Sequence, residues 1–232
     1  MERIDRLAWS AIEAELDARG CARAGPVFRD EECAALTALY ADDAVFRKRV
    51  DMERHRFGRG DYAYFASPLP ELVSELRHAL YPRLAPLANR WMERLRRPER
   101  FPAQLDEYLD RCHRAGQVKP TPLLLHYEKS GFNCLHRDLY GALAFPLQAM
   151  VMLCEPGADF TGGEFLVVEN TARRQSIGTA LSPLRGELVV FAVNERPVAG
   201  KRGFTRASLR HGVSTVESGE RYTLGIIFHD AA

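Results

Sequence analysis

Cysteine is scarce in this sequence and poorly arranged for structural chemistry. The five cysteines are odd in number, widely scattered, and none of them forms a CxxC pair: Cys21, Cys33, Cys112, Cys134 and Cys154. This arrangement argues against both a zinc ribbon and a disulfide scaffold. Because reduced thiols are typical of the cell interior, we expect a soluble cytoplasmic protein.

Long hydrophobic runs and an excess of one charge are also missing. No stretch approaches the roughly 20 apolar residues that a membrane span needs, and charged residues interrupt the first 20 positions, unlike a secretory signal. We therefore expect no membrane partner. The 32 basic residues nearly balance the 31 acidic ones, for a net charge of +1, which excludes a histone-like binder acting through bulk charge.

The pattern of apolar residues changes near residue 119. Before it, spacings of three and four residues predict helices over about 4–19, 30–40, 70–97 and 103–114, the third broken near Pro82 and Pro86. After it, segments rich in β-formers predict five strands, within 121–129, 148–155, 163–170, 186–193 and 221–228. We predict one domain over 1–232, mainly β with flanking α, in which a mainly helical part (1–118) braces an antiparallel sandwich or jelly roll (119–232).

His136 and Asp138 form a His-x-Asp motif in the strand-rich half. Side chains two apart in an extended strand point to the same face, so both can reach one metal ion. A second histidine from a distant strand would complete the two-histidine, one-carboxylate face of non-haem Fe(II) oxygenases. His211, which we predict at the start of a strand, is the candidate. A lone His-x-Asp also arises by chance, and a hydrogen-bonded structural histidine is the common alternative.

Arg221 follows His211 by ten residues and begins a predicted strand. In that strand Arg221, Thr223 and Gly225 share one face. A guanidinium that faces an apolar interior needs an anionic partner, because an unpaired buried charge is costly. A dicarboxylate cosubstrate would supply one, since arginine binds carboxylates in a bidentate fork.

Taken together, these residues resemble the Fe(II)- and 2-oxoglutarate-dependent oxygenases, whose pattern is His-x-Asp, a distal His and a basic residue about ten positions later. The resemblance covers roughly residues 120–230 and implies a double-stranded β-helix (cupin-like) core. It implies an oxidoreductase that couples decarboxylation of 2-oxoglutarate to hydroxylation or oxidative demethylation, with Fe(II), 2-oxoglutarate and O2 as cofactors. It also assigns the site residues: His136, Asp138 and His211 as catalytic iron ligands, and Arg221, Thr223 and Tyr127 as contacts of 2-oxoglutarate.

Two subgroups of that superfamily are similar in different ways. Tyr127 precedes His136 by nine residues with Gly131 between them, as in prolyl-hydroxylase-like members. The whole chain looks like a bacterial group linked to oxidative repair of alkylated nucleic-acid bases, and Leu135 to Asp138 resembles the Leu-His-x-Asp of AlkB-type demethylases. Those demethylases carry a second arginine six residues after the first, where this chain has Ile227, which favours the prolyl-hydroxylase-like pattern for the cosubstrate site.

His126 and Glu128 form a second His-x-acid pair on a predicted strand. If this pair held the iron, Tyr127 would face away from it, because side chains alternate between the two faces of a strand. We therefore prefer His136 and Asp138 and expect His126 to be a structural residue near the rim of the barrel.

Two segments are unusually basic. Residues 47–60 hold six Arg or Lys and two acids, and residues 90–100 hold five Arg and two acids. With Tyr62, Tyr64, Phe65 and Trp91 nearby, they predict a nucleic-acid surface with stacking aromatics, whereas a solvated helix face and an ordinary loop are the competing interpretation. Three functions stay open: an oxygenase acting on alkylated bases in DNA, an oxygenase acting on a protein side chain or small metabolite, and a non-redox cupin-like protein that binds a metal or a sugar.

Overall fold

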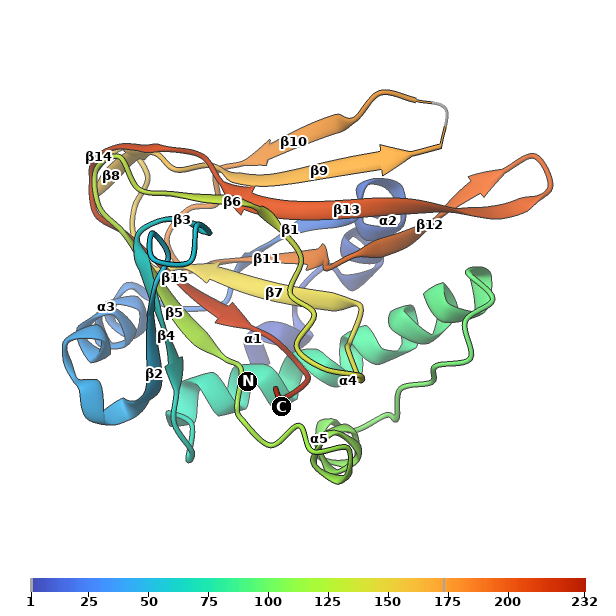
Figure 1. The fold of residues 1–232 in the computed structure, drawn as a ribbon, viewed down its shortest axis with the longest axis horizontal. Helices are drawn as coiled ribbons and strands as arrows, with labels where there is room; N and C mark the ends of the chain where they lie inside the picture. Colours follow the sequence, from blue (N-terminus) through green and yellow to red (C-terminus); the bar gives the residue numbers. More distant parts are fainter. Residues whose placement is uncertain (1, 173) are drawn as a thin grey trace.

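Two antiparallel sheets form the centre of the molecule in the computed structural model, which describes residues 2–172 and 174–232 (Figure 1). The strands are β1 (Cys21–Pro26), β2 (Phe46–Asp51), β3 (Gly58–Arg59), β4 (Asp61–Phe65), β5 (Leu123–Tyr127), β6 (Phe132–His136), β7 (Leu147–Met152), β8 (Phe160–Gly162), β9 (Phe165–Thr171), β10 (Ile177–Leu181), β11 (Glu187–Ala192), β12 (Glu195–Gly200), β13 (Gly203–Val213), β14 (Val216–Gly219) and β15 (Arg221–Ile226). The helices are α1 (Glu2–Asp5), α2 (Trp9–Arg19), α3 (Asp30–Ala38), α4 (Glu71–Arg94) and α5 (Leu105–Arg114), with 3-10 turns η1 (Leu39–Ala41) and η2 (Asp43–Val45).

The larger sheet has the strand order β1-β11-β7-β15-β5-β4-β2, and the second has β10-β9-β13-β6-β3 with β12 paired to β13. Each of the five predicted strands is present, as β5, β7, β9, β11 and β15. Every residue of β7 is buried, whereas alternate residues of β9 are buried, as expected for a central strand and a half-covered one. The predicted mainly β fold with flanking helices is confirmed.

The predicted division of the chain near residue 119 is wrong for the sheets. Strands β1, β2 and β4 belong to the larger sheet and β3 pairs with β6, so the first 118 residues supply four strands of the core. β1 and β2 occupy the two edges, where one side of a strand has no neighbour. Edge strands tolerate charge, and the arginine and lysine residues of CARAGP and FRKRVD interrupt the apolar runs by which central strands are found in a sequence.

The predicted break in the long helix is also wrong, because α4 runs without interruption over 24 residues. Each proline removes only one backbone donor, and the opposite side of the helix is fixed in the core by fully buried Leu80, Leu84 and Trp91. Pro82 is half-buried and Pro86 is exposed, so their rings lie away from that packed side. No helix of the described chain is both long enough and apolar enough to cross a membrane.

Candidate active site

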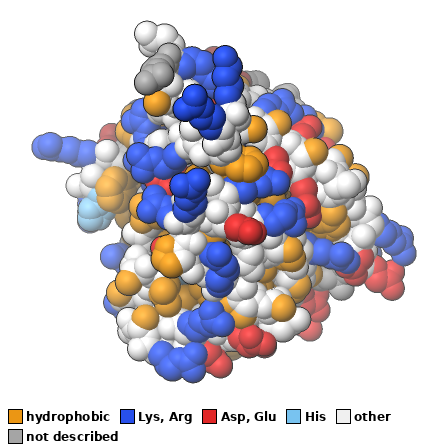
Figure 2. Space-filling model, turned by 90° about the vertical axis from the view of Figure 1, so that its right-hand side faces the viewer, with side chains coloured by type: hydrophobic (Ala, Val, Ile, Leu, Met, Phe, Trp, Pro, Cys, Tyr) orange, Lys and Arg blue, Asp and Glu red, His pale blue; other side chains and the backbone are white. Residues whose placement is uncertain are grey.

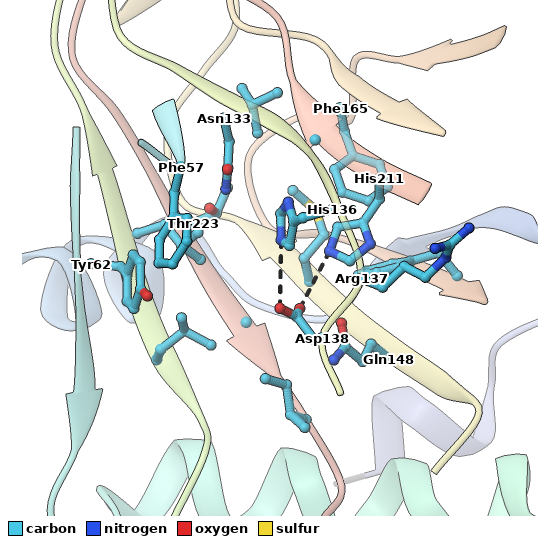
Figure 3. A pocket seen from close by; sticks show the side chains of 18 of the residues that line it. Phe57, Tyr62, Asn133, His136, Arg137, Asp138, Gln148, Phe165, His211 and Thr223 are labelled. Carbon is cyan, nitrogen blue, oxygen red and sulfur yellow. Dashed lines mark ion pairs between the residues drawn. The ribbon is translucent and has the colours of Figure 1, made fainter. Parts of the chain in front are cut away.

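His136, Asp138 and His211 converge on one point between the two sheets (Figure 3). His136 Nε2 lies 3.5 Å from Asp138 Oδ1, and His211 Nε2 lies 3.3 Å from Asp138 Oδ2. β13 runs antiparallel to β6 with His211 directly opposite His136, and the centroids of the two imidazole rings are 4.3 Å apart. The three residues, far apart in the sequence, therefore lie together as predicted.

The strands that carry these residues differ from the prediction in two details. His211 lies near the end of the 11-residue strand β13, not at the start of a strand, and the polar sequence GFTRASLR conceals the first part of β13. Asp138 lies in the loop after β6, which ends at His136. The loop, rather than strand alternation, therefore aims the carboxylate at the histidines.

Neighbouring groups orient the triad. His136 Nδ1 donates to the carbonyl oxygen of Cys134 at 2.7 Å, so its Nε2 presents a lone pair to the pocket. The Tyr140 hydroxyl donates to Asp138 Oδ1 at 2.6 Å. His211 is 5% exposed and packs against Phe191, with ring centroids 4.7 Å apart. The three ligand atoms are thus held toward one another by hydrogen bonds and packing.

The charges of the triad depend on burial and on Asp138. Burial alone would raise the pKa of Asp138, but hydrogen bonds from His136 and His211 outweigh it and hold that pKa well below its ordinary value. Burial lowers the pKa of His211. Burial would also lower the pKa of His136, but the hydrogen bond and charge of Asp138, together with the hydrogen bond to Cys134, outweigh it and raise that pKa. An ionised carboxylate and a neutral His211 suit a divalent cation, which would take the place of the His136 proton.

Arg221 lies in the same pocket with no exposed surface. Its Nε, Nη1 and Nη2 atoms have no hydrogen-bond partner among residues 2–172 and 174–232, and its guanidinium lies 5.5 Å from the ring centre of Tyr127. Burial lowers the pKa of Arg221. Because an unpaired buried charge is strongly unfavourable, the site requires an anion. The carboxylate of 2-oxoglutarate, which arginine can bind through two parallel hydrogen bonds, meets that requirement.

Tyr127 and Thr223 lie beside Arg221. In the antiparallel pair of β15 with β5, Arg221 is opposite Tyr127. Tyr127 is fully buried and its hydroxyl accepts from Asn133 Nδ2 at 3.2 Å, while Thr223 is 2% exposed. All six residues predicted for the iron and cosubstrate sites line one cavity of about 390 Å³.

Several residues of this cavity were not identified from the sequence. Gln148 is 2% exposed, its Nε2 has no hydrogen-bond partner in the described chain, and it lies on the Asp138 side of the pocket (Figure 3). A lone glutamine in the otherwise apolar strand LQAMVM was the available signal. Phe57 is 49% exposed where it lines the pocket, next to Arg56. Phe57 carries no sequence pattern that indicates this position.

Three other residues complete the surroundings of the site. His126, predicted to be structural, lies at the side of the larger sheet away from the pocket, where its Nδ1 is 3.0 Å from Asp61 Oδ1. His229 is completely buried. Cys134 is exposed and lines the cavity.

Fold and site together define the class of protein, that of the Fe(II)- and 2-oxoglutarate-dependent oxygenases. The fold is similar to that of a prolyl-4-hydroxylase from Pseudomonas putida, with a TM-score of 0.57, 15% identity, and coverage of 97% of this chain and 99% of that chain. It is also similar to a 2OG-Fe(II) oxygenase family oxidoreductase from Burkholderia pseudomallei, with a TM-score of 0.52, 18% identity, and coverage of 97% and 93%.

The chain belongs to the family described as "Oxygenase, catalysing oxidative methylation of damaged DNA", whose model matches residues 60–231. Two uncharacterised proteins from Mycobacterium tuberculosis (strains CDC 1551 / Oshkosh and ATCC 25618 / H37Rv) are each 42% identical over 231 residues, which cover 99% of this chain and 94% of theirs. The protein is therefore an oxidoreductase of the oxygenase class. Its His-Asp-His group and the unpaired guanidinium of Arg221 fit Fe(II) and 2-oxoglutarate as cofactors, used with O2.

Proposed function

We propose that residues 1–232 act as one dioxygenase domain that removes alkyl groups oxidatively from nucleobases in DNA. In this proposal His136, Asp138 and His211 hold Fe(II), and Arg221, Thr223 and Tyr127 bind 2-oxoglutarate. The observation that carries it is the buried, unpartnered guanidinium of Arg221 in the same cavity as the His-Asp-His group. β1, β3 and β4 pair with strands of the second half, which supports a single domain.

Iron with its cosubstrate supplies the oxidation: one atom of O2 enters succinate as 2-oxoglutarate loses CO2, and the other enters a substrate C–H bond. The residues of this chain bind, orient and exclude water. Arg221 fixes the cosubstrate carboxylate, and the Cys134 carbonyl holds the proton on His136 Nδ1. Phe165 and Phe191 cover His211 from solvent. A hydroxymethyl group formed on a base nitrogen would then leave as formaldehyde and restore the base.

The pocket mouth supports a flat, hydrogen-bonding substrate such as a nucleobase. Phe57 and Tyr62 line the cavity and offer aromatic faces on which a base can stack. The free Nε2 of Gln148 can donate to an acceptor on the edge of that base, as enzymes that extrude a base from DNA require. Arg56, exposed beside Phe57, lies at the mouth, where a phosphate would pass.

The two basic segments do not form the stacking surface predicted from the sequence. Tyr64, Phe65 and Trp91 are buried and cannot contact bases. Five of the ten arginines there are paired with acids of this chain: Arg49 with Asp43, Arg54 with Asp51, Arg90 with Glu13, Arg94 with Asp17 and Arg97 with Glu195. The segments also lie apart, one at β2 and β3 and the other at the end of α4 (Figure 1). Of the four aromatics, only Tyr62 lines the cavity.

A basic face remains for contact with a nucleic-acid backbone. Figure 2 shows the side of the molecule where the β12–β13 hairpin and the end of α4 lie, with Lys and Arg side chains spread over it. At the hairpin tip, Lys201 and Arg202 are exposed beside Phe204, which is 46% exposed. We propose that this face and residues 90–100 contact phosphates.

The test is succinate release by the Fe-loaded enzyme with a methylated oligonucleotide, against the same oligonucleotide without the methyl group. We expect succinate and formaldehyde in equal amounts only with the methylated strand, and binding that weakens steeply with salt. Asp138→Ala should reduce both products to background. Turnover with peptides or amino acids and none with methylated DNA would overturn the substrate assignment.

The second candidate is hydroxylation of a protein side chain or small metabolite. Ile227 takes the place of the second arginine of AlkB-type demethylases, and the fold is similar to that of a prolyl-4-hydroxylase.

Binding of the iron and the cosubstrate has its own test. Fe(II) and 2-oxoglutarate, mixed with the protein without oxygen, should give a visible charge-transfer absorption. No colour would favour a non-redox cupin-like binding protein.

We also propose a cytoplasmic location. All five cysteines are free, and four of them are buried. Thiols kept reduced in this way are typical of proteins in a reducing compartment.

A further inference from the structure

We propose that His126, Glu128 and Glu220 form a second metal site, for a structural divalent cation such as Zn²⁺, on the outer face of the larger sheet. One ligand atom from each of the three residues lies within 4.8 Å of the others. His126 Nε2 is 3.5 Å from Glu220 Oε2. Around a tetrahedral Zn²⁺ with bonds of about 2.1 Å, neighbouring ligand atoms are about 3.4 Å apart.

The imidazole of His126 is fixed in the orientation of a ligand. It lies between the rings of Tyr222 and Tyr40, with centroids 4.4 and 5.3 Å away. Its Nδ1 is 3.0 Å from Asp61 Oδ1, and Asp61 also accepts the Tyr40 hydroxyl. A carboxylate on one imidazole nitrogen fixes the tautomer in which the other presents a lone pair, the arrangement found behind metal-bound histidines.

The free nitrogen faces two carboxylates that lack other counterions. His126 Nε2 is buried and has no hydrogen-bond partner within the described residues. Neither Glu128 nor Glu220 forms an ion pair with an arginine or lysine in the part of the chain described, although Arg49, Arg59 and Lys129 line the same groove. A lone pair facing two carboxylates is repelled unless a cation lies between them.

A proton is the competing cation. Burial would lower the pKa of His126, but the hydrogen bond with Asp61 and the charges of Asp61, Glu220 and Glu128 outweigh it and raise that pKa. Arg49, which pairs with Asp61 at 3.7 Å, opposes a further positive charge. The surroundings as a whole favour positive charge at Nε2, and metal analysis distinguishes a bound ion from a proton.

The position of this site gives it a consequence for the cosubstrate pocket, which rests on the proposed function. Tyr127 lies between His126 and Glu128 and points to the other face of β5, and Arg221 follows Glu220. In the β5–β15 pair, Arg221 is opposite Tyr127 and Tyr222 is opposite His126. A cation bound outside would therefore join the two strands at the point where they hold 2-oxoglutarate inside.

The experiment is anaerobic titration of the full chain with Co²⁺, followed by visible absorption and by metal analysis after gel filtration. We expect two equivalents for the wild type, one for Glu220→Gln, one for His211→Ala and none for the double variant. Glu53→Gln, a carboxylate of the same groove outside the proposed ligand set, should keep two. Asp61→Asn should weaken the second equivalent by about 10- to 100-fold.

The outcomes separate the two metal sites. One equivalent in the wild type, or two equivalents of unchanged affinity in both Glu128→Gln and Glu220→Gln, would overturn the second site. Two equivalents in His211→Ala would instead overturn the iron assignment. Glu128 and Glu220 are exposed, so their substitution should leave the fold intact, and circular dichroism of each variant checks this.

Discussion

Tyr140 controls the iron site without being a proposed ligand. Its hydroxyl donates to Asp138 Oδ1 at 2.6 Å and so fixes the orientation of the carboxylate. We expect Tyr140→Phe to lower Fe(II) affinity by about 10- to 100-fold, the usual effect of losing a group that orients a ligand. Equilibrium titration with Fe(II) under argon measures it.

Tyr81→Phe is the matched control for Tyr140→Phe. The Tyr81 hydroxyl is buried but has no hydrogen-bond partner in the described chain, and Tyr81 does not line the iron cavity. Its loss should leave Fe(II) affinity unchanged. Equal losses in the two variants would show that Tyr140 acts only through packing.

Arg221 is stabilising only when its anion is bound. Removing one partner of a buried charged pair costs about 2 to 5 kcal/mol, so Arg221→Met should raise the Kd of 2-oxoglutarate by roughly 30-fold or more. In the absence of 2-oxoglutarate the same variant should unfold at higher urea than the wild type, since it removes an unpaired buried charge. Urea unfolding with and without 2-oxoglutarate measures the effect on stability. If the variant unfolds at lower urea than the wild type in both conditions, Arg221 does not destabilise the protein when its anion is absent.

Sequence spacing predicted the residues of the proposed iron and cosubstrate site. The His-x-Asp motif, the distal histidine and Arg221 follow spacing rules that coordination and charge impose, and their side chains lie in one cavity. Gln148 and Phe57 were not predicted because a single glutamine or phenylalanine has no spacing rule. The burial of Tyr64 and Trp91 depends on which face of an element is packed, which local sequence does not determine.

Among the elements, α4 offers a direct test of proline in a packed helix. Pro86 lies inside the helix and is exposed, so its replacement leaves no cavity. Proline is about 3 kcal/mol worse than alanine in a helix interior, while alanine loses about 0.4 to 1 kcal/mol through greater freedom of the unfolded chain. We expect Pro86→Ala to stabilise the protein by about 2 to 2.6 kcal/mol in chemical unfolding.

Pro98→Ala is the control, because Pro98 is exposed in the segment after α4. In Pro98→Ala only the greater freedom of the unfolded chain changes. The free energy of unfolding should therefore fall slightly or stay unchanged. A destabilised Pro86→Ala variant would mean that the proline ring itself supports the helix.

The elements that were predicted well are those whose pattern comes from burial. β7 and β11 are apolar because they are central strands, and their segments stand out in the sequence. β2 and β13 are rich in arginine and other polar residues, because one lies at a sheet edge and the other projects as a hairpin (Figure 1). Pairing with neighbouring strands (β4 for β2, and β6, β9 and β12 for β13), rather than local preference, determines their structure.

For the whole molecule, His229 links stability to pH. It is completely buried, its Nδ1 accepts the backbone N–H of Phe145 at 3.2 Å, and burial lowers its pKa to about 4. In the unfolded chain its pKa is about 6.5. The unfolded state therefore binds the proton first, so this contribution is complete above pH 6.5 and is lost as the pH falls to about 4.

The 2.5-unit difference corresponds to about 3 kcal/mol between pH 6.5 and 4. We expect His229→Asn, which can still accept from Phe145, to show a smaller decrease in unfolding free energy over this range than the wild type. Urea unfolding of both proteins in a metal chelator measures the difference. Parallel pH profiles would show that His229 does not titrate on unfolding.

The two outer strands of the larger sheet come from the first 51 residues, β1 beside β11 and β2 beside β4. A shortened chain that begins at residue 60, where the family match starts, would lose both and leave two rows of unpaired backbone amides facing water. Exposed strand edges of this kind form backbone hydrogen bonds with the strand edges of other molecules, which leads to aggregation. The first 51 residues thus protect the edges of the larger sheet from intermolecular β-pairing. A fragment without them should aggregate and precipitate, although it keeps His136, Asp138 and His211.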